Sequence, residues 1–106
     1  MKFTVNNLDW EMNFEDGDKV HLNQDNETIL GLTEYIDQKI SIRNGLSQRL
    51  TRSTVIHELC HCFLFSFGFC ADSYDEEAVC NLFGSHADAI LSLTDKFLKE
   101  RGEKEC

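Results

Sequence analysis

The chain has 106 residues, 42% of them hydrophobic, which is enough for one hydrophobic core and too few for two. Its 19 acidic and 10 basic side chains give a formal net charge of -9. Such a surface repels phosphate backbones, which argues against direct nucleic-acid binding. No repeat or linker composition interrupts the sequence, so we expect a single domain over residues 1–106.

The sequence predicts neither export nor membrane insertion. Residues 1–7 lack the apolar stretch of a signal peptide, and no segment has the roughly 18 uninterrupted apolar residues of a membrane-spanning helix. Five Cys without an export signal are typical of reduced thiols rather than of a disulfide framework. We therefore expect a cytoplasmic protein without a membrane partner.

Several segments of the first 43 residues alternate between polar and apolar side chains, which is typical of strands. Residues 2–5 and 10–14 predict a hairpin with one buried face, joined by turn residues 6–9. Residues 19–27 are mostly polar and give no clear prediction. Residues 28–36 and 39–43 predict two further strands joined by Asp37 and Gln38.

Gly31 lies inside the predicted strand of residues 28–36, where a glycine weakens the strand. It marks either a bulge without a function or a place where another backbone approaches closely. In a hydrolase, that backbone could belong to a peptide substrate that pairs along the edge of the sheet. The sequence leaves both interpretations open.

Two helices are predicted after the strands. Ser47 is a plausible N-cap of a helix that runs to Phe67 and stops at Gly68. The second helix begins near Asp75 with acidic residues suited to its dipole, and residues 100–106 are expected to fray. Its predicted apolar stripe consists of Val79, Leu82, Phe83, His86, Ile90, Leu93 and Phe97.

The first predicted helix contains the motif H-E-x-x-H at residues 57–61. Four residues turn a helix through about 400°, so His57 and His61 project from one face, one turn apart and about 40° from each other. Both imidazoles can bind one Zn²⁺ in that arrangement. Glu58 lies about 100° round from His57, where it suits a water bound to the metal better than the metal itself.

Residues 55–67 are apolar nearly all round, which predicts a helix that is buried on most sides. Burying two His and one Glu in such a helix is costly unless partners satisfy them, and we interpret the missing partner as Zn²⁺. The competing interpretation is that the three side chains hydrogen-bond one another or line a wet groove.

A catalytic zinc site needs a third protein ligand and an open position for water. Glu76 and Glu77 begin the second predicted helix and are both candidates. Helical phase places Glu76 nearer to the centre of the apolar stripe, at about 60° from Val79 against about 160° for Glu77. A ligand at the start of a helix need not lie on that centre, so phase alone does not decide between them.

Two segments of the chain resemble the two motifs of gluzincin zinc metallopeptidases, namely His57-Glu58-Leu59-Cys60-His61 and Glu77-Ala78-Val79-Cys80-Asn81. Within that group, the chain is most similar to the ImmA/IrrE-type peptidases of phages and bacteria and to minigluzincins. The resemblance implies that Glu77 is the third ligand and that Asn81 orients a ligand by a hydrogen bond. The spacing between the two motifs is short for the family, which favours a compact connection. Glu77 is therefore preferred to Glu76.

The resemblance also implies zinc-dependent hydrolysis of a peptide bond by an endopeptidase. A chain of 106 residues has little material for substrate pockets, so we expect an activity that is weak, very selective or dependent on a partner. Glu58 would activate the zinc-bound water and return the proton to the leaving amine. Candidate donors for the oxyanion are His86, Tyr74 and Tyr35, although His86 also fits a core position. The implied substrate is a protein or peptide. ImmA-like peptidases of phages and mobile elements cleave a DNA-binding repressor, and a basic repressor would be attracted to an acidic enzyme.

Two other functions fit the motif. A non-catalytic binding or regulatory protein could retain the zinc-stabilised scaffold, although such a protein would not need Glu58. A structural zinc module would instead use thiolates, because zinc binds them well. That second alternative is weakened by the lack of a C-x-x-C motif and by the helical positions of Cys60 and Cys62, which point apart.

These elements together predict an α+β fold. We expect a small zincin-like domain with a mostly antiparallel sheet of three to four strands. The sheet would pack on the H-E-x-x-H helix and on a second helix that carries the glutamate ligand.

Overall fold

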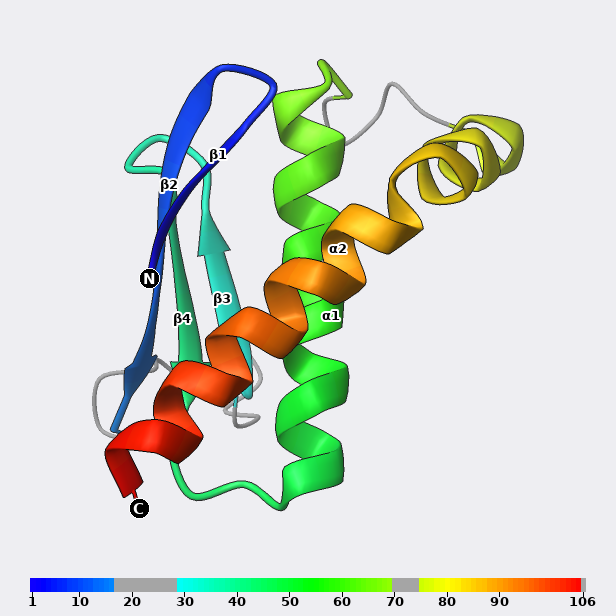
Figure 1. Cartoon of the computed structure of the whole chain (residues 1–106). Coiled ribbons are helices and arrows are strands. Elements are labelled where there is room, and N and C mark those ends of the chain that lie inside the picture. The colour runs from blue at the N-terminus through cyan, green and yellow to red at the C-terminus, as the bar shows by residue number, and fades with distance from the viewer. Residues whose placement is uncertain (17–28, 70–74, 106) are drawn as a thin grey trace.

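The computed structural model describes residues 1–16, 29–69 and 75–105, with the side chains as far as Glu100. The fold is α+β, as predicted (Figure 1). The elements are β1 (Lys2–Val5), β2 (Leu8–Glu15), β3 (Gly31–Glu34), β4 (Lys39–Arg43), α1 (Gln48–Ser66) and α2 (Glu76–Glu105).

The four strands form one sheet in the order β1-β2-β4-β3. β1 pairs with β2 and β3 pairs with β4 in antiparallel fashion, but β2 and β4 run parallel. The sheet is therefore mixed, and the prediction of a mostly antiparallel sheet missed this central pairing. Its register aligns Met12 with Ile40 and Phe14 with Ile42, which puts the apolar side chains of both strands on one face.

Local sequence explains the first hairpin. Asn6 and Asn7 connect β1 to β2 with φ values of 46° and 69°. Asparagine tolerates this left-handed region better than most residues, and two such residues give the turn whose twist matches that of the strands. The predicted hairpin is confirmed.

The second hairpin is shorter than predicted. β3 covers Gly31–Glu34, residues 29–30 and 35–36 of the predicted strand lie outside it, and Thr28 is outside the described residues. Residues 35–38 form the turn to β4. Gln38 has a φ of 53° in this turn. Tyr35 and Ile36 have side chains typical of strands, which is why the sequence suggested a longer strand. Ile36 is nevertheless 98% exposed, so it does not pack in the core of this fold.

The ends of α1 follow the predicted cap and stop residues. The Ser47 side chain accepts a hydrogen bond of 3.2 Å from the Leu50 N–H, and Gly68 has a φ of 91° just after α1. Asp75 caps α2 by accepting a bond of 2.9 Å from the Ala78 N–H. The backbone of α2 is helical to Glu105, whereas Cys106 lies outside the described residues, and the expected fraying of this end stays a prediction. Lys, Glu and Arg are good helix formers, which accounts for the helical backbone up to Glu105.

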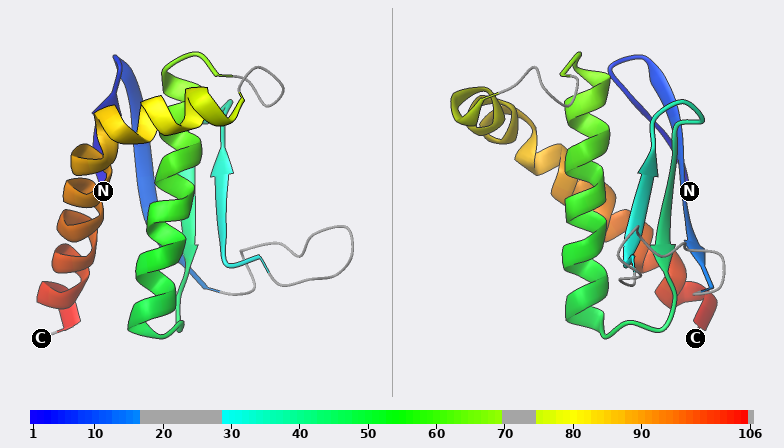
Figure 2. Two further views of the ribbon diagram at one scale, coloured as in Figure 1. Left: turned by 90° about the vertical axis from the view of Figure 1, so that its right-hand side faces the viewer. Right: turned by 180° about the vertical axis from the view of Figure 1, so that it is seen from behind.

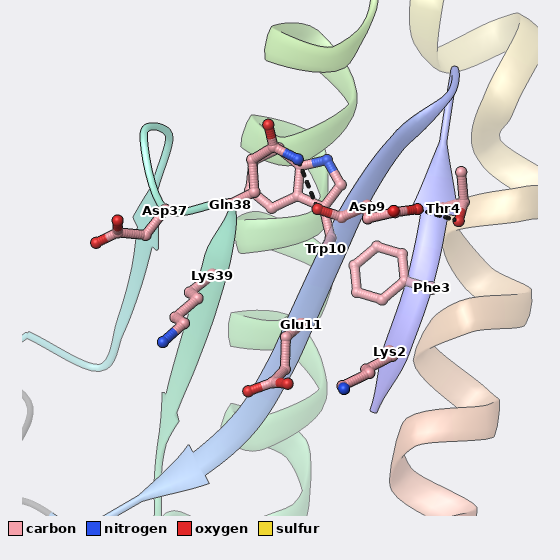
Figure 3. Close-up of a pocket in the computed structure, with 9 residues that line it drawn as sticks. All are labelled: Lys2, Phe3, Thr4, Asp9, Trp10, Glu11, Asp37, Gln38 and Lys39. Atoms are coloured by element: carbon pink, nitrogen blue, oxygen red, sulfur yellow. Dashed lines mark hydrogen bonds between the residues drawn. The ribbon is translucent and has the colours of Figure 1, made fainter.

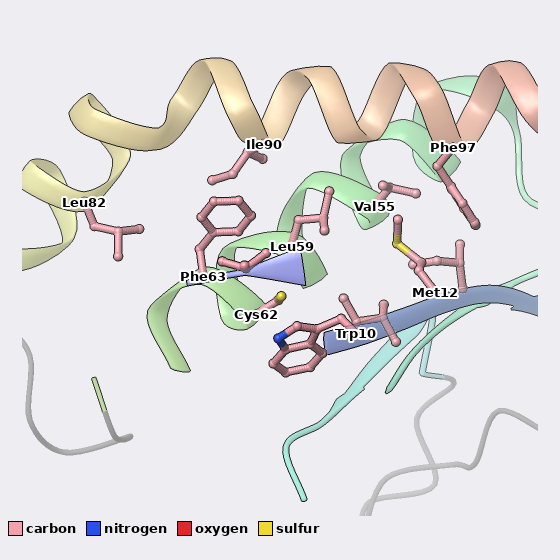
Figure 4. Close-up of a cluster of buried hydrophobic side chains, with 12 residues drawn as sticks. Trp10, Met12, Val55, Leu59, Cys62, Phe63, Leu82, Ile90 and Phe97 are labelled. Atoms are coloured by element: carbon pink, nitrogen blue, oxygen red, sulfur yellow. The ribbon is translucent and has the colours of Figure 1, made fainter. Parts of the chain in front are cut away.

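Both helices pack on the same face of the sheet, and the core lies between them and β2 (Figures 1 and 4). The Trp10 Nε1–H donates a buried hydrogen bond of 2.9 Å to the Ser66 Oγ, which fixes the end of α1 to β2. Phe97 of α2 stacks on Phe14 with ring centroids 4.6 Å apart. The buried core contains Val5, Trp10, Met12, Ile40, Ile42, Val55, Leu59, Cys62, Phe63, Leu82, Ile90 and Phe97.

The predicted stripe of α2 is buried only in part. Leu82, Ile90 and Phe97 are buried, whereas Val79 is 36% and Phe83 44% exposed. The views in Figure 2 show the reason, since the first turns of α2 extend past α1 and away from the sheet. Among the helices of the described residues, none is long and apolar enough to cross a membrane.

The prediction that residues 55–67 are buried on most sides is confirmed except at His57, which is the one exposed residue of this stretch. Val55, Leu59, Cys62 and Phe63 face the core, but the His57 side chain is 68% exposed. The sheet and α2 cover two sides of α1 and leave the side that carries His57 open to solvent. Of the three residues that define the motif, Glu58 alone is buried.

Candidate metal centre

The two histidines of α1 meet at their Nε2 atoms, which lie 3.2 Å apart. Zinc binds imidazole nitrogen at about 2.0–2.1 Å in tetrahedral geometry, which requires about 3.3 Å between two nitrogen ligands. The His57 and His61 pair therefore fits the requirement for two zinc ligands. The same separation also fits a hydrogen bond between two neutral imidazoles. The distance alone therefore does not identify a metal site, and further ligands have to be considered.

Glu58 stands beside this pair. Its Oε2 is 3.9 Å from the His57 Nε2, and its Oε1 accepts a hydrogen bond of 2.8 Å from the Thr33 hydroxyl. The carboxylate is buried, and it lies close enough to the two imidazoles to contact any water molecule bound between them. The i to i+4 spacing of the histidines and the neighbouring carboxylate are thus arranged as the sequence predicts.

Gly31 permits the close packing of β3 against α1. A Cβ atom at this position would lie 2.8 Å from the Glu58 Cγ and 2.9 Å from the Thr54 Cγ2. Gly31 is the first residue of β3 and pairs with Ile42 in the ladder. The bulge interpretation is therefore wrong, and side chains of α1 approach Gly31 closely. The approach of a substrate strand stays a prediction.

The substitution Gly31→Ala is expected to lower the free energy of unfolding by about 1–3 kcal/mol, because the added methyl overpacks the contact with Glu58. Urea unfolding followed by circular dichroism measures this change. Gly84→Ala is the matched control, since a Cβ at Gly84 in α2 meets nothing within 4 Å. That variant should be more stable than the wild type by about 0.5–1 kcal/mol. Equal stability of Gly31→Ala and wild type would contradict the packing described.

Of the three oxyanion candidates, Tyr35 lies beside the histidine pair, but at the His61 Nδ1 rather than at the Nε2 atoms, so its role as an oxyanion donor stays a prediction. Its hydroxyl lies 3.5 Å from the His61 Nδ1, and its ring stacks on Phe65 at 4.9 Å. His86 instead packs on Phe67 with ring centroids 4.3 Å apart, in agreement with its interpretation as a core histidine. Tyr74 lies outside the described residues.

The predicted third ligand is not grouped with the histidines. Glu76, Glu77 and Asn81 lie exposed in the first turns of α2. Over residues 1–16, 29–69 and 75–100, no three His, Cys, Asp or Glu side chains come close enough together to hold a metal ion. Glu77 as the third ligand, Glu76 as its competitor and Asn81 as an orienting residue therefore stay predictions.

The cysteines of α1 are poor candidates for a thiolate site. Burial raises the pKa of the Cys62 thiol to about 12, against a smaller opposing effect of the Ser66 hydrogen bond. Burial also raises the pKa of Cys60. Zinc binds the thiolate form, which both environments disfavour. Cys80 is exposed on α2, and Cys70 and Cys106 lie outside the described residues.

A hollow of about 420 Å³ adjoins the candidate centre. It is lined by Leu30, Gly31, Leu50, Ser53, Thr54, His57 and Glu58. A second hollow of about 520 Å³, lined in part by Lys2, Glu11 and Lys39, lies on the outer face of the sheet. Figure 3 shows that the strands separate this second hollow from α1, so it is not part of the candidate centre.

Neither a protein-family model nor a curated protein nor a solved structure matches the chain. The function therefore has to be argued from the site itself. The site offers two imidazole nitrogens at the separation that zinc requires and a buried carboxylate beside them.

Sequence reasoning missed Thr33, the hydrogen-bond partner of Glu58. A signal was present, because Gly31, Thr33 and Tyr35 alternate along one face of a predicted strand. The sequence did not show which helix or strand would pack against that face.

Proposed function

We propose that the chain is a zinc-dependent peptidase with a zincin-like fold of the gluzincin type. His57 and His61 would hold the metal, with Glu77 as the predicted third ligand. The observation that carries the proposal is the convergence of the two Nε2 atoms, 3.2 Å apart, beside the Glu58 carboxylate. A hydrogen-bonded histidine pair would account for the two rings but not for a buried carboxylate next to them.

In this proposal Glu58 is the catalytic base. Bound zinc would supply a Lewis acid that lowers the pKa of a water molecule towards about 7 and polarises the substrate carbonyl. The Glu58 Oε2 accepts the proton of the attacking water and then donates it to the amine that leaves, so that one water is consumed for each peptide bond cleaved.

The substrate in this proposal is a protein or peptide in extended conformation. β3 is an edge strand of the sheet that the described residues form, and a peptide could add to it by main-chain hydrogen bonds. One side chain next to the scissile bond would enter the 420 Å³ hollow beside Glu58. The net charge of -9 favours a basic substrate, such as a DNA-binding regulator in the cytoplasm of a bacterium that carries a phage or mobile element.

The alternative is a non-catalytic protein that retains the zinc scaffold. The Glu58 side chain is only 9% exposed, and burying a carboxylate costs free energy, whereas a scaffold needs no base at this position. The presence of Glu58 and its hydrogen bond to Thr33 therefore supports catalysis.

A mixture of unrelated synthetic peptides tests the proposal. The zinc-loaded protein is expected to produce new peptide ends, detected by mass spectrometry, at a small set of sequences. A chelator should stop the cleavage and added zinc should restore it. The absence of new ends, in the peptide mixture and in basic DNA-binding proteins alike, would favour the scaffold over the peptidase.

A further inference from the structure

One face of β3 is directed at the candidate centre. Gly31, Thr33 and Tyr35 are two residues apart, so they project to the same side of the strand or its continuation. Gly31 packs on the Glu58 side chain, the Thr33 hydroxyl bonds to the Glu58 carboxylate, and the Tyr35 hydroxyl lies at His61. This alternation brings the strand into contact with two of the groups that the proposed reaction uses.

We propose that Thr33 and Tyr35 are positioning residues, of which Thr33 orients the base Glu58 and Tyr35 orients the ligand His61. The inference rests on the proposed function. Neither residue is placed against the substrate, and each acts through the side chain that it holds.

Thr33 selects which carboxylate oxygen faces the histidines. Its Oγ1 lies 2.8 Å from the Glu58 Oε1 and 3.3 Å from the Glu58 backbone oxygen. A hydroxyl has one proton to donate, and the shorter distance to a charged acceptor favours the carboxylate. Oε1 is thereby engaged, and Oε2 is the oxygen that faces the His57 Nε2 at 3.9 Å.

Tyr35 sets the tautomer and the ring orientation of His61. A histidine that binds metal through Nε2 carries its proton on Nδ1, and that N–H can donate to the Tyr35 oxygen at 3.5 Å. The His61 Nε2 is then free of a proton and points towards the His57 Nε2. The stacking of Tyr35 on Phe65, with an angle of 22° between the rings, restricts where the hydroxyl lies.

A purely structural role would have a different signature. Thr33 would only satisfy a buried carboxylate, and Tyr35 would only pack on Phe65. The substitution Tyr35→Phe retains the ring and removes the oxygen, so a packing role predicts no change in metal binding.

The first test is zinc affinity, measured by competition with a chromophoric chelator. Tyr35→Phe is expected to bind zinc about 10–100-fold more weakly than the wild type, as is usual when the outer partner of a metal-binding histidine is lost. Ile36→Ala is the matched control in the same turn, because Ile36 is 98% exposed, and its affinity should not change. Unchanged affinity in Tyr35→Phe would overturn the role of Tyr35. A wild type that binds no zinc would overturn the proposed function as well.

The second test separates kcat from KM on a peptide that the wild type cleaves. Thr33→Val should lower kcat about 10-fold with little change in KM or in zinc content, since one hydrogen bond to a charged group is lost. Thr33→Ser restores the hydroxyl and should restore kcat. A Thr33→Ser variant as slow as Thr33→Val would overturn the role of Thr33, while leaving the peptidase itself in place.

Discussion

Replacing Glu58 by Gln is expected to reduce kcat by about 10²–10⁴-fold while zinc remains bound, because a general base contributes a factor of this size. The amide keeps the shape of the side chain and an oxygen that can accept the Thr33 hydrogen bond, but it cannot take a proton from water. Cleavage of a peptide found in the mixture gives the rate, and elemental analysis gives the zinc content.

The control for this variant is Glu34→Gln. Glu34 is an exposed carboxylate at the end of β3, so its replacement makes the same chemical change away from the histidines. Its kcat should equal that of the wild type. A Glu58→Gln variant that cleaves at the wild-type rate would contradict the assignment of Glu58 as the base, whatever the metal content.

The second large effect is expected for His61→Ala. Loss of a hydrogen-bond partner of a metal-binding histidine weakens zinc binding by up to about 100-fold, and loss of the histidine itself should weaken it more. The variant removes the Nε2 that lies 3.2 Å from the His57 Nε2 and leaves one imidazole at the centre. Competition with a chromophoric chelator measures the affinity. His86→Ala serves as the control, because His86 stacks on Phe67 and takes no part in the histidine pair.

The same titration decides between the two candidate third ligands. Glu77→Gln should weaken zinc binding, and Glu76→Gln should leave it unchanged. The reverse order would assign the ligand to Glu76. If neither glutamate affects zinc affinity, the resemblance to the gluzincin motif does not extend to α2.

Local rules made much of the fold predictable from the sequence. The Ser47 cap and the start of α2 near Asp75 depend on residues within a few positions, and both appear in the structure as expected. The first turn is also present, although it is confined to Asn6 and Asn7 instead of residues 6–9. The parallel pairing of β2 with β4 was not predictable in this way. It joins residues that are far apart in the chain, and no local pattern distinguishes it from an antiparallel alternative.

In the candidate centre, too, the features set by local geometry were predictable from the sequence, and those set by tertiary contacts were not. The meeting of His57 with His61 follows from helical geometry alone, so the sequence was sufficient. The roles of Gly31 and Thr33 depend on the approach of β3 to α1, which is a tertiary contact. The exposure of His57 was mispredicted for a related reason, because the apolar residues around it pack against only two neighbouring layers.

The most direct test of the account is X-ray absorption spectroscopy at the zinc edge of the zinc-loaded protein. The account predicts nitrogen and oxygen ligands at about 2.0–2.2 Å, including two imidazoles, and no sulfur. A sulfur shell at about 2.3 Å would contradict it, because the metal would then lie on cysteine thiolates in a structural module.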